Sequence, residues 1–124
     1  MKNFLVFALS AMSIFVSAAT VSASTWTDPA GITWRALPIP SSFYRTEAAC
    51  RNIGMHLPLT WDLLDAIEYG IFDETINTEF GASIARFDWM WTNGAHSEMV
   101  SKQGDQAIDD PYTAHFGICS SRYR

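Results

Sequence analysis

The sequence predicts an α+β fold in which two helices pack on a small antiparallel sheet and one disulfide closes the domain. Three observations support this prediction. Apolar residues recur at helical spacing in two consecutive segments, residues 42–53 and 60–69. Short runs before and after them alternate between apolar and polar residues, as strands do. The chain has only two cysteines, one in the first helical segment and one near its C-terminal end.

The first 23 residues have the composition of a secretory signal peptide. Lys2 precedes an apolar run from Phe4 to Val16, and the small residues Val21-Ser22-Ala23 follow. The run is short for a membrane span, and its small-residue ending argues against an uncleaved anchor. We therefore predict cleavage after Ala23, a single exported domain over residues 24–124, a secreted or periplasmic location, and no stable membrane anchor.

The charge of the exported part limits its partners. Cleavage would remove 23 of 124 residues, leaving 101, and would remove one of eight basic residues while keeping all 13 acidic ones. The resulting formal charge of −6 argues against nucleic acid and against anionic membrane surfaces as partners. It also argues against highly sulfated polysaccharides, unless the seven basic residues cluster on one face.

Residues 25–37 predict two strands joined by a tight turn. Residues 26–27 precede Asp28-Pro29-Ala30-Gly31, where proline comes early and glycine late, as turns prefer. Residues 32–37 then alternate, which places Ile32 and Trp34 on one face. We expect Trp34 to anchor the core.

Residues 42–54 predict the first helix. Ser42 is a suitable N-cap, and Gly54 suits the left-handed residue that ends many helices. One stripe of this helix should be buried: Phe43, Thr46, Ala49, Cys50 and Ile53.

Residues 60–70 predict a second helix, with Thr60 as its cap and Gly70 as its end. Its buried stripe should contain Trp61, Leu64 and Ile67, with Leu63 beside them, while Asp62, Asp65 and Glu68 should be solvated. Residues 71–80 add at most a looser helical turn or two.

The remaining segments predict antiparallel strands. Residues 86–93 alternate, with Phe87, Trp89 and Trp91 on one face, and Asn93-Gly94 is a strong turn signal. Residues 95–102 supply the returning strand, residues 103–112 a polar loop, and residues 115–120 a closing strand.

Cys50 and Cys119 both lie in the exported part, where two cysteines most simply form one disulfide. It would close a loop of about 70 residues, for which chain entropy predicts roughly 4 kcal/mol of stabilisation. A metal pair lacks further ligands at suitable spacing, and a catalytic thiol lacks a local signature.

The order of these motifs resembles the C-type-lectin-like fold, and in particular the bacterial exported Lcl C-terminal domain. The motifs are an Asp-to-Trp opening, a helix ending in cysteine, a Leu-Pro turn into a second helix, a Trp-bearing strand and a closing cysteine. They correspond to residues 28–34, Cys50, residues 56–60, residues 91–92 and residues 117–119. The resemblance implies a lectin-like shape and ligand binding by the long loop between late strands. It does not imply calcium-dependent sugar binding, because the E-P-N, Q-P-D and W-N-D sequences of such sites do not occur.

The candidate ligand-binding loop runs from Asn93 to Thr113. Its candidate binding residues are His96, Lys102, Asp105, Asp109, Asp110 and Tyr112. Its three aspartates have the chemistry of calcium ligands, but their spacing fits no known loop motif, so we expect no cofactor. Tyr44 and Tyr112 are expected to be exposed, together with Trp26 and Tyr123.

No motif indicates catalysis or a resident metal. His56, His96 and His115 are scattered without paired spacing, and no nucleophile motif of the G-x-S-x-G type occurs. We expect an exported, non-catalytic binding domain that recognises a glycan or a protein at the cell envelope or outside the cell. A periplasmic enzyme or enzyme inhibitor, and a structural envelope or adhesin subunit, remain alternatives.

Overall fold

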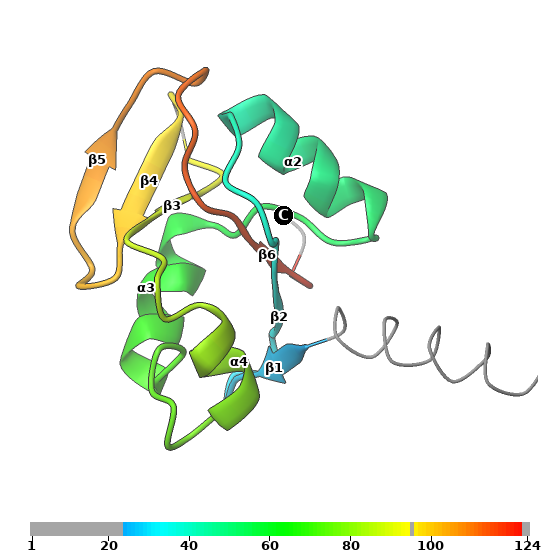
Figure 1. Cartoon of the computed structure of the whole chain (residues 1–124), viewed down its shortest axis with the longest axis vertical. Coiled ribbons are helices and arrows are strands. Elements are labelled where there is room, and N and C mark those ends of the chain that lie inside the picture. The colour runs from blue at the N-terminus through cyan, green and yellow to red at the C-terminus, as the bar shows by residue number, and fades with distance from the viewer. Residues whose placement is uncertain (1–23, 95, 123–124) are drawn as a thin grey trace, which may run out of the picture.

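The computed structural model describes residues 24–94 and 96–122, which form an α+β domain with three helices and two three-stranded antiparallel sheets (Figure 1). The predicted signal peptide and Tyr123 lie outside the described residues. The elements are β1 (Thr25–Thr27), β2 (Thr33–Ala36), α2 (Phe43–Asn52), α3 (Thr60–Tyr69), α4 (Thr78–Ser83), β3 (Trp89–Trp91), β4 (Glu98–Ser101), β5 (Gln106–Ile108) and β6 (Ile118–Ser120).

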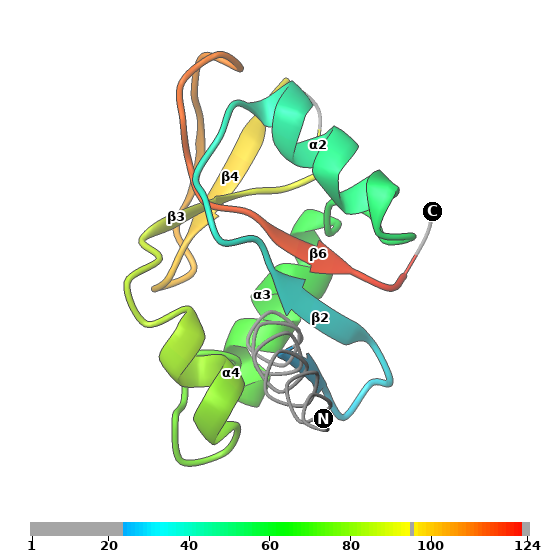
Figure 2. The same cartoon turned by 45° about the vertical axis from the view of Figure 1, so that its right-hand side comes forward.

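The first sheet has the strand order β1–β2–β6, so the beginning of the domain pairs with its end (Figure 2). The predicted β1–β2 turn is confirmed, and Asp28 holds it together. One carboxylate oxygen of Asp28 accepts the amides of Ala30 and Ile32, and the other accepts Trp34 Nε1 at 2.9 Å. Trp34 is fully buried, as predicted. A buried carboxylate with three donors is stable because its hydrogen-bonding capacity is used.

Helix α2 begins and ends close to the predicted positions. Ser42 caps it by accepting the Arg45 amide at 3.3 Å, and Gly54 follows the helix with a φ of 78°. Cys50 forms the predicted disulfide with Cys119, with 5.4 Å between their Cα atoms. The disulfide therefore fixes α2 to strand β6.

Helix α3 buries part of the predicted stripe: Leu63 is fully buried, and Leu64 and Ile67 are partly buried against the core. Its inner face presents Leu63 and Ala66, and Trp61 is 73% exposed, so the prediction of a buried Trp61 is wrong. Asp62, predicted to be solvated, is buried, and its Oδ2 lies 3.4 Å from Arg122 Nε. Thr60 is the first helical residue rather than the cap. Contacts between distant residues, such as the one between Asp62 and Arg122 near the C-terminal end, decide which face of α3 is buried.

A third helix, α4, makes the prediction of two helices wrong. The side-chain amide of Asn77 donates to the carbonyls of Gly70 and Ile71, which fixes the turn before this helix. Phe80 and Ile84 then enter the core. The helix has only six residues, which is too short to give a clear periodic signal.

The second sheet has the order β3–β4–β5 and confirms the antiparallel pairing around Asn93-Gly94. Its third strand, β5, lies within the segment predicted as a polar loop, so the single predicted sheet is in fact two. Gln106 and Ile108 of β5 are exposed, as at a sheet edge, and a strand of only three residues gives no clear alternation in the sequence.

Strands β3, β4 and β6 separate two hydrophobic clusters. The first cluster contains eleven buried residues: Ile32, Trp34, Leu63, Ala66, Ile71, Phe80, Ile84, Phe87, Met90, Val100 and Ile118. The second cluster surrounds the disulfide and contains Phe43, Cys50, Leu57, Trp91, Met99 and Cys119. Adjacent strand residues enter different clusters because side chains alternate along a strand. Phe87 belongs to the first cluster rather than sharing a face with Trp91, because it precedes β3.

Within the described residues, no helix has the length and apolar character needed to cross a membrane.

Candidate functional site

The predicted binding loop folds largely as the β4–β5 hairpin, which separates the candidate residues into two groups. Lys102 and Asp105 lie in the turn that joins the strands, which we call the turn end. Asp109, Asp110 and Tyr112 follow β5 at the opposite end, which we call the open end. His96 precedes β4 and lies toward the open end, with a φ of 63° and an exposed side chain. The structure therefore does not bring the six candidate residues together.

At the turn end, the Lys102 side chain and the Asp105 backbone make internal contacts, while the Asp105 side chain is exposed. Lys102 donates through its Nζ to the carbonyl of Ala85, and the Nζ lies 5.3 Å from the centroid of the Phe72 ring. Ser101 Oγ accepts the Asp105 amide at 3.0 Å, and the Ser101 amide donates to the Asp105 carbonyl at 2.8 Å. The Ser101–Asp105 contacts close the hairpin, and the Lys102 contacts join its turn to segments that precede β3, so both are structural.

At the open end, Asp109 pairs with His115. Asp109 Oδ2 lies 2.7 Å from His115 Nε2, and Asp109 Oδ1 accepts the Asp110 amide at 2.7 Å. The hydrogen bond to His115, followed by that from the Asp110 amide, lowers the pKa of the Asp109 carboxyl; burial opposes this, and the charge interaction with His115 adds a weaker lowering. His115 was not among the predicted site residues, because its proximity to Asp109 arises from the fold.

Two exposed tyrosines meet beside this pair. Tyr112 is 76% exposed and Tyr44, on α2, is 54% exposed, which agrees with the prediction for both. Their ring centroids lie 5.9 Å apart, with an interplanar angle of 52°. Asp110 Oδ1 accepts the Tyr112 amide at 2.9 Å. We call the surface formed by Tyr44, Asp110 and Tyr112 the tyrosine face.

The tyrosine face rests on a buried support. The Pro111 carbonyl accepts the first amide of α2, that of Phe43, at 2.8 Å, which joins the loop to the helix. The Phe43 and His115 rings both make edge contacts with buried Trp91, at 5.5 and 5.0 Å. Trp91 Nε1 in turn donates to the Ser41 carbonyl at 2.9 Å. Tyr44 was predicted to be exposed but was not selected as a site residue, because it lies on a helix 68 positions from Tyr112.

This arrangement has the chemistry of a recognition surface. Tyrosine rings offer a large apolar face at a small entropic cost, and their hydroxyls form hydrogen bonds. The exposed carboxylate of Asp110 accepts hydroxyl or amide donors. Asp109 and His115 lack, among the described contacts, a hydrogen bond to a hydroxyl or thiol nucleophile. In the described part of the chain, no three His, Cys, Asp or Glu residues are grouped to hold a metal ion.

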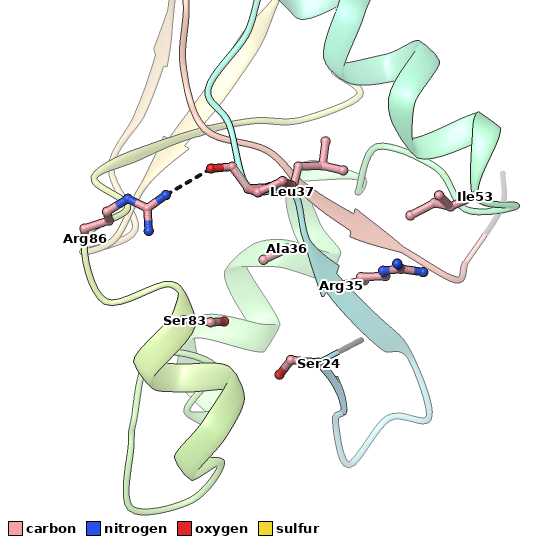
Figure 3. A pocket seen from close by; sticks show the side chains of 8 residues that line it. Ser24, Arg35, Ala36, Leu37, Ile53, Ser83 and Arg86 are labelled. Atoms are coloured by element: carbon pink, nitrogen blue, oxygen red, sulfur yellow. Dashed lines mark hydrogen bonds between the residues drawn. The ribbon is translucent and has the colours of Figure 1, made fainter. Parts of the chain in front are cut away.

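A separate pocket of about 500 Å³ lies beside β2 of the first sheet (Figure 3). Its walls come from the residue before β1, from β2 and the segment after it, from the end of α2, and from the end of α4 and the segment after it. The lining residues are Ser24, Arg35, Ala36, Leu37, Pro38, Ile53, Ser83 and Arg86. None of these residues was predicted as a site residue, because no local motif connects them.

Comparisons of the chain with protein-family models, curated proteins and solved structures give no match.

Proposed function

We propose that the protein is an exported, non-catalytic binding domain with a C-type-lectin-like fold, which recognises a glycan or a protein at the cell envelope or outside the cell. The tyrosine face is its binding surface. The observation that carries this proposal is the contact between two exposed tyrosines from distant parts of the chain, beside the exposed carboxylate of Asp110.

The lectin-like fold is supported by the connectivity. Strand β2 pairs with the last strand, β6, with Trp34 opposite Ser120, and the disulfide joins α2 to the same strand. The two joined cysteines are the ones in the helix and in the closing strand on which the sequence resemblance rests. The α+β architecture described above holds whether or not the fold is lectin-like.

Export is supported by the disulfide together with the composition of residues 1–23. Structural disulfides persist in oxidising compartments, such as the periplasm and the extracellular space. An exported domain meets glycans and proteins of the envelope, and both offer apolar faces bordered by hydrogen-bond donors.

The face is suited to binding because it is pre-organised. The first amide of α2 is bonded to the Pro111 carbonyl, and the disulfide fixes the same helix to β6. A surface that is ordered before binding loses less conformational entropy when a ligand arrives. Exposed tyrosines are also enriched among the residues that dominate binding energies.

Glycan and envelope-protein arrays test the proposal directly. We expect the wild-type protein to bind members of one array, with or without EDTA. Tyr44→Ala combined with Tyr112→Ala should weaken binding at least about tenfold, because such anchors contribute roughly 2 kcal/mol or more.

A matched control uses two exposed aromatic residues on α3. Trp61→Ala combined with Tyr69→Ala removes similar exposed area from a different surface and should leave binding unchanged. Equal binding by the wild type and the Tyr44/Tyr112 variant would contradict the tyrosine face as the site. Clear substrate turnover in a hydrolase screen would instead support the enzymatic alternative.

A further inference from the structure

The pocket beside β2 combines apolar walls with two arginines. Ala36, Leu37, Pro38 and Ile53 provide the apolar surface, and Arg35 and Arg86 stand on opposite sides (Figure 3). No acidic residue occurs among the eight described residues that line it. Its volume of about 500 Å³ lies within the roughly 300–1,000 Å³ that is usual for small-molecule sites.

Arg86 is held in place without a carboxylate. Its guanidinium donates to the Pro38 carbonyl at 3.0 Å and lies 5.6 Å from the centroids of both the Phe87 and Phe116 rings. The described contacts therefore use one of its five N–H groups. In a chain with 13 acidic residues, the described part places none of them in an ion pair with Arg86.

Ser24 adds a hydrogen-bonding group to the pocket. Its hydroxyl is buried and has no hydrogen-bond partner in the described part of the chain. Buried polar atoms normally have a partner, so this hydroxyl is suited to a polar group of a bound molecule.

We propose that this pocket binds a small amphiphilic monocarboxylate, with the carboxylate at Arg86 and an aliphatic chain over Leu37, Pro38 and Ile53. Arginine is suited to this role because its planar guanidinium bonds a carboxylate through two parallel hydrogen bonds. The pocket and the tyrosine face share no residue, so the two sites are separable.

Calorimetric titration with decanoate, and with decan-1-ol as the uncharged analogue, tests the proposal. We expect decanoate to bind with a dissociation constant below about 1 mM. Decan-1-ol should bind at least about tenfold more weakly, because it lacks the charge-assisted hydrogen bonds. Equal affinity for the two compounds, or no decanoate binding at this concentration, would overturn the proposal.

Two variants and one control locate the site. Arg86→Gln should weaken decanoate binding about tenfold or more, and Ala36→Leu should weaken it by filling the pocket while keeping Arg86. Arg45→Gln, on the exposed surface of α2, removes the same charge elsewhere and should bind decanoate as the wild type does. If Arg86→Gln does not fold, Ala36→Leu decides the result. If Arg86→Gln or Ala36→Leu folds and binds decanoate with wild-type affinity, decanoate does not bind in this pocket and the proposal is contradicted.

Discussion

The two ends of the β4–β5 hairpin both carry charged side chains, but only the open end also carries exposed tyrosine rings. At the turn end, the ammonium group of Lys102 is bound by the Ala85 carbonyl and the Phe72 ring. At the open end, Tyr112 meets Tyr44 from α2, and Asp110 remains exposed beside them. The difference arises from the neighbours that tertiary structure supplies, since both ends belong to the same polar segment of sequence.

The substitution with the largest expected effect on this comparison removes the disulfide. Cys50→Ala combined with Cys119→Ala frees a loop with a sequence separation of 69 and should destabilise the domain by roughly 4 kcal/mol. The midpoint of thermal unfolding should fall by about 15–30 °C. Differential scanning calorimetry measures this shift.

The same variant should affect the two ends unequally. Below its unfolding transition, the Phe43 amide, bonded to the Pro111 carbonyl, should lose hydrogen-exchange protection. The Gly104 amide, bonded to the Ser101 carbonyl within the turn end, should keep more of its protection. Two free thiols in the wild-type protein under oxidising conditions would contradict the Cys50–Cys119 disulfide itself.

A smaller effect is expected from Trp91→Phe, which changes the support of the open end. The variant loses the indole donor to the Ser41 carbonyl and leaves a cavity against Phe43 and His115, at a cost of about 1–3 kcal/mol. Urea unfolding measures this change. Trp61→Phe is the matched control and should change stability by less than about 0.5 kcal/mol, because Trp61 is exposed. A similar loss of stability in both variants would contradict the burial of Trp91 and the exposure of Trp61.

The smallest effect concerns pH at the open end. The pKa of Asp109 is lowered in the folded state, so its contribution to stability is present above the ordinary value of 3.8 and is lost as pH falls through the lower folded value. His115→Phe removes the ring donor, and the pKa of Asp109 should rise toward its ordinary value. Carboxyl NMR titration measures this rise.

Asp73 provides an internal control for that titration. The hydroxyl of Thr75, followed by its amide, lowers the pKa of Asp73; burial opposes this, the Ile76 amide adds a weaker lowering, and His115 takes no part. Its pKa should stay the same in His115→Phe. A shift of Asp73 with no shift of Asp109 would show that the assigned hydrogen bond is wrong.

Local signals in the sequence predicted the elements whose structure is determined locally. Ser42, Gly54 and Gly70 mark helix ends through backbone requirements that their neighbours do not alter. The disulfide was predictable because the chain has only two cysteines. Strand β5 and helix α4 were missed because three and six residues give no clear periodicity.

The candidate site was only partly predictable, because its geometry depends on contacts between distant residues. Exposure of Tyr44 and Tyr112 followed from their positions off the apolar stripes. Their contact, and the pairing of Asp109 with His115, required the fold that brings α2 to the segment after β5. Trp61 illustrates the same limit, since contacts of α3 with the rest of the domain decide which of its faces is buried.

The most direct test is a nuclear Overhauser measurement between the Tyr44 and Tyr112 rings in the free, oxidised protein. With 5.9 Å between the ring centroids, ring protons of the two residues should give cross-peaks, and these should disappear in the Cys50→Ala/Cys119→Ala variant. Absence of these cross-peaks in the folded wild-type protein would show that the two tyrosines do not form one surface, and the proposed binding site would be lost with it.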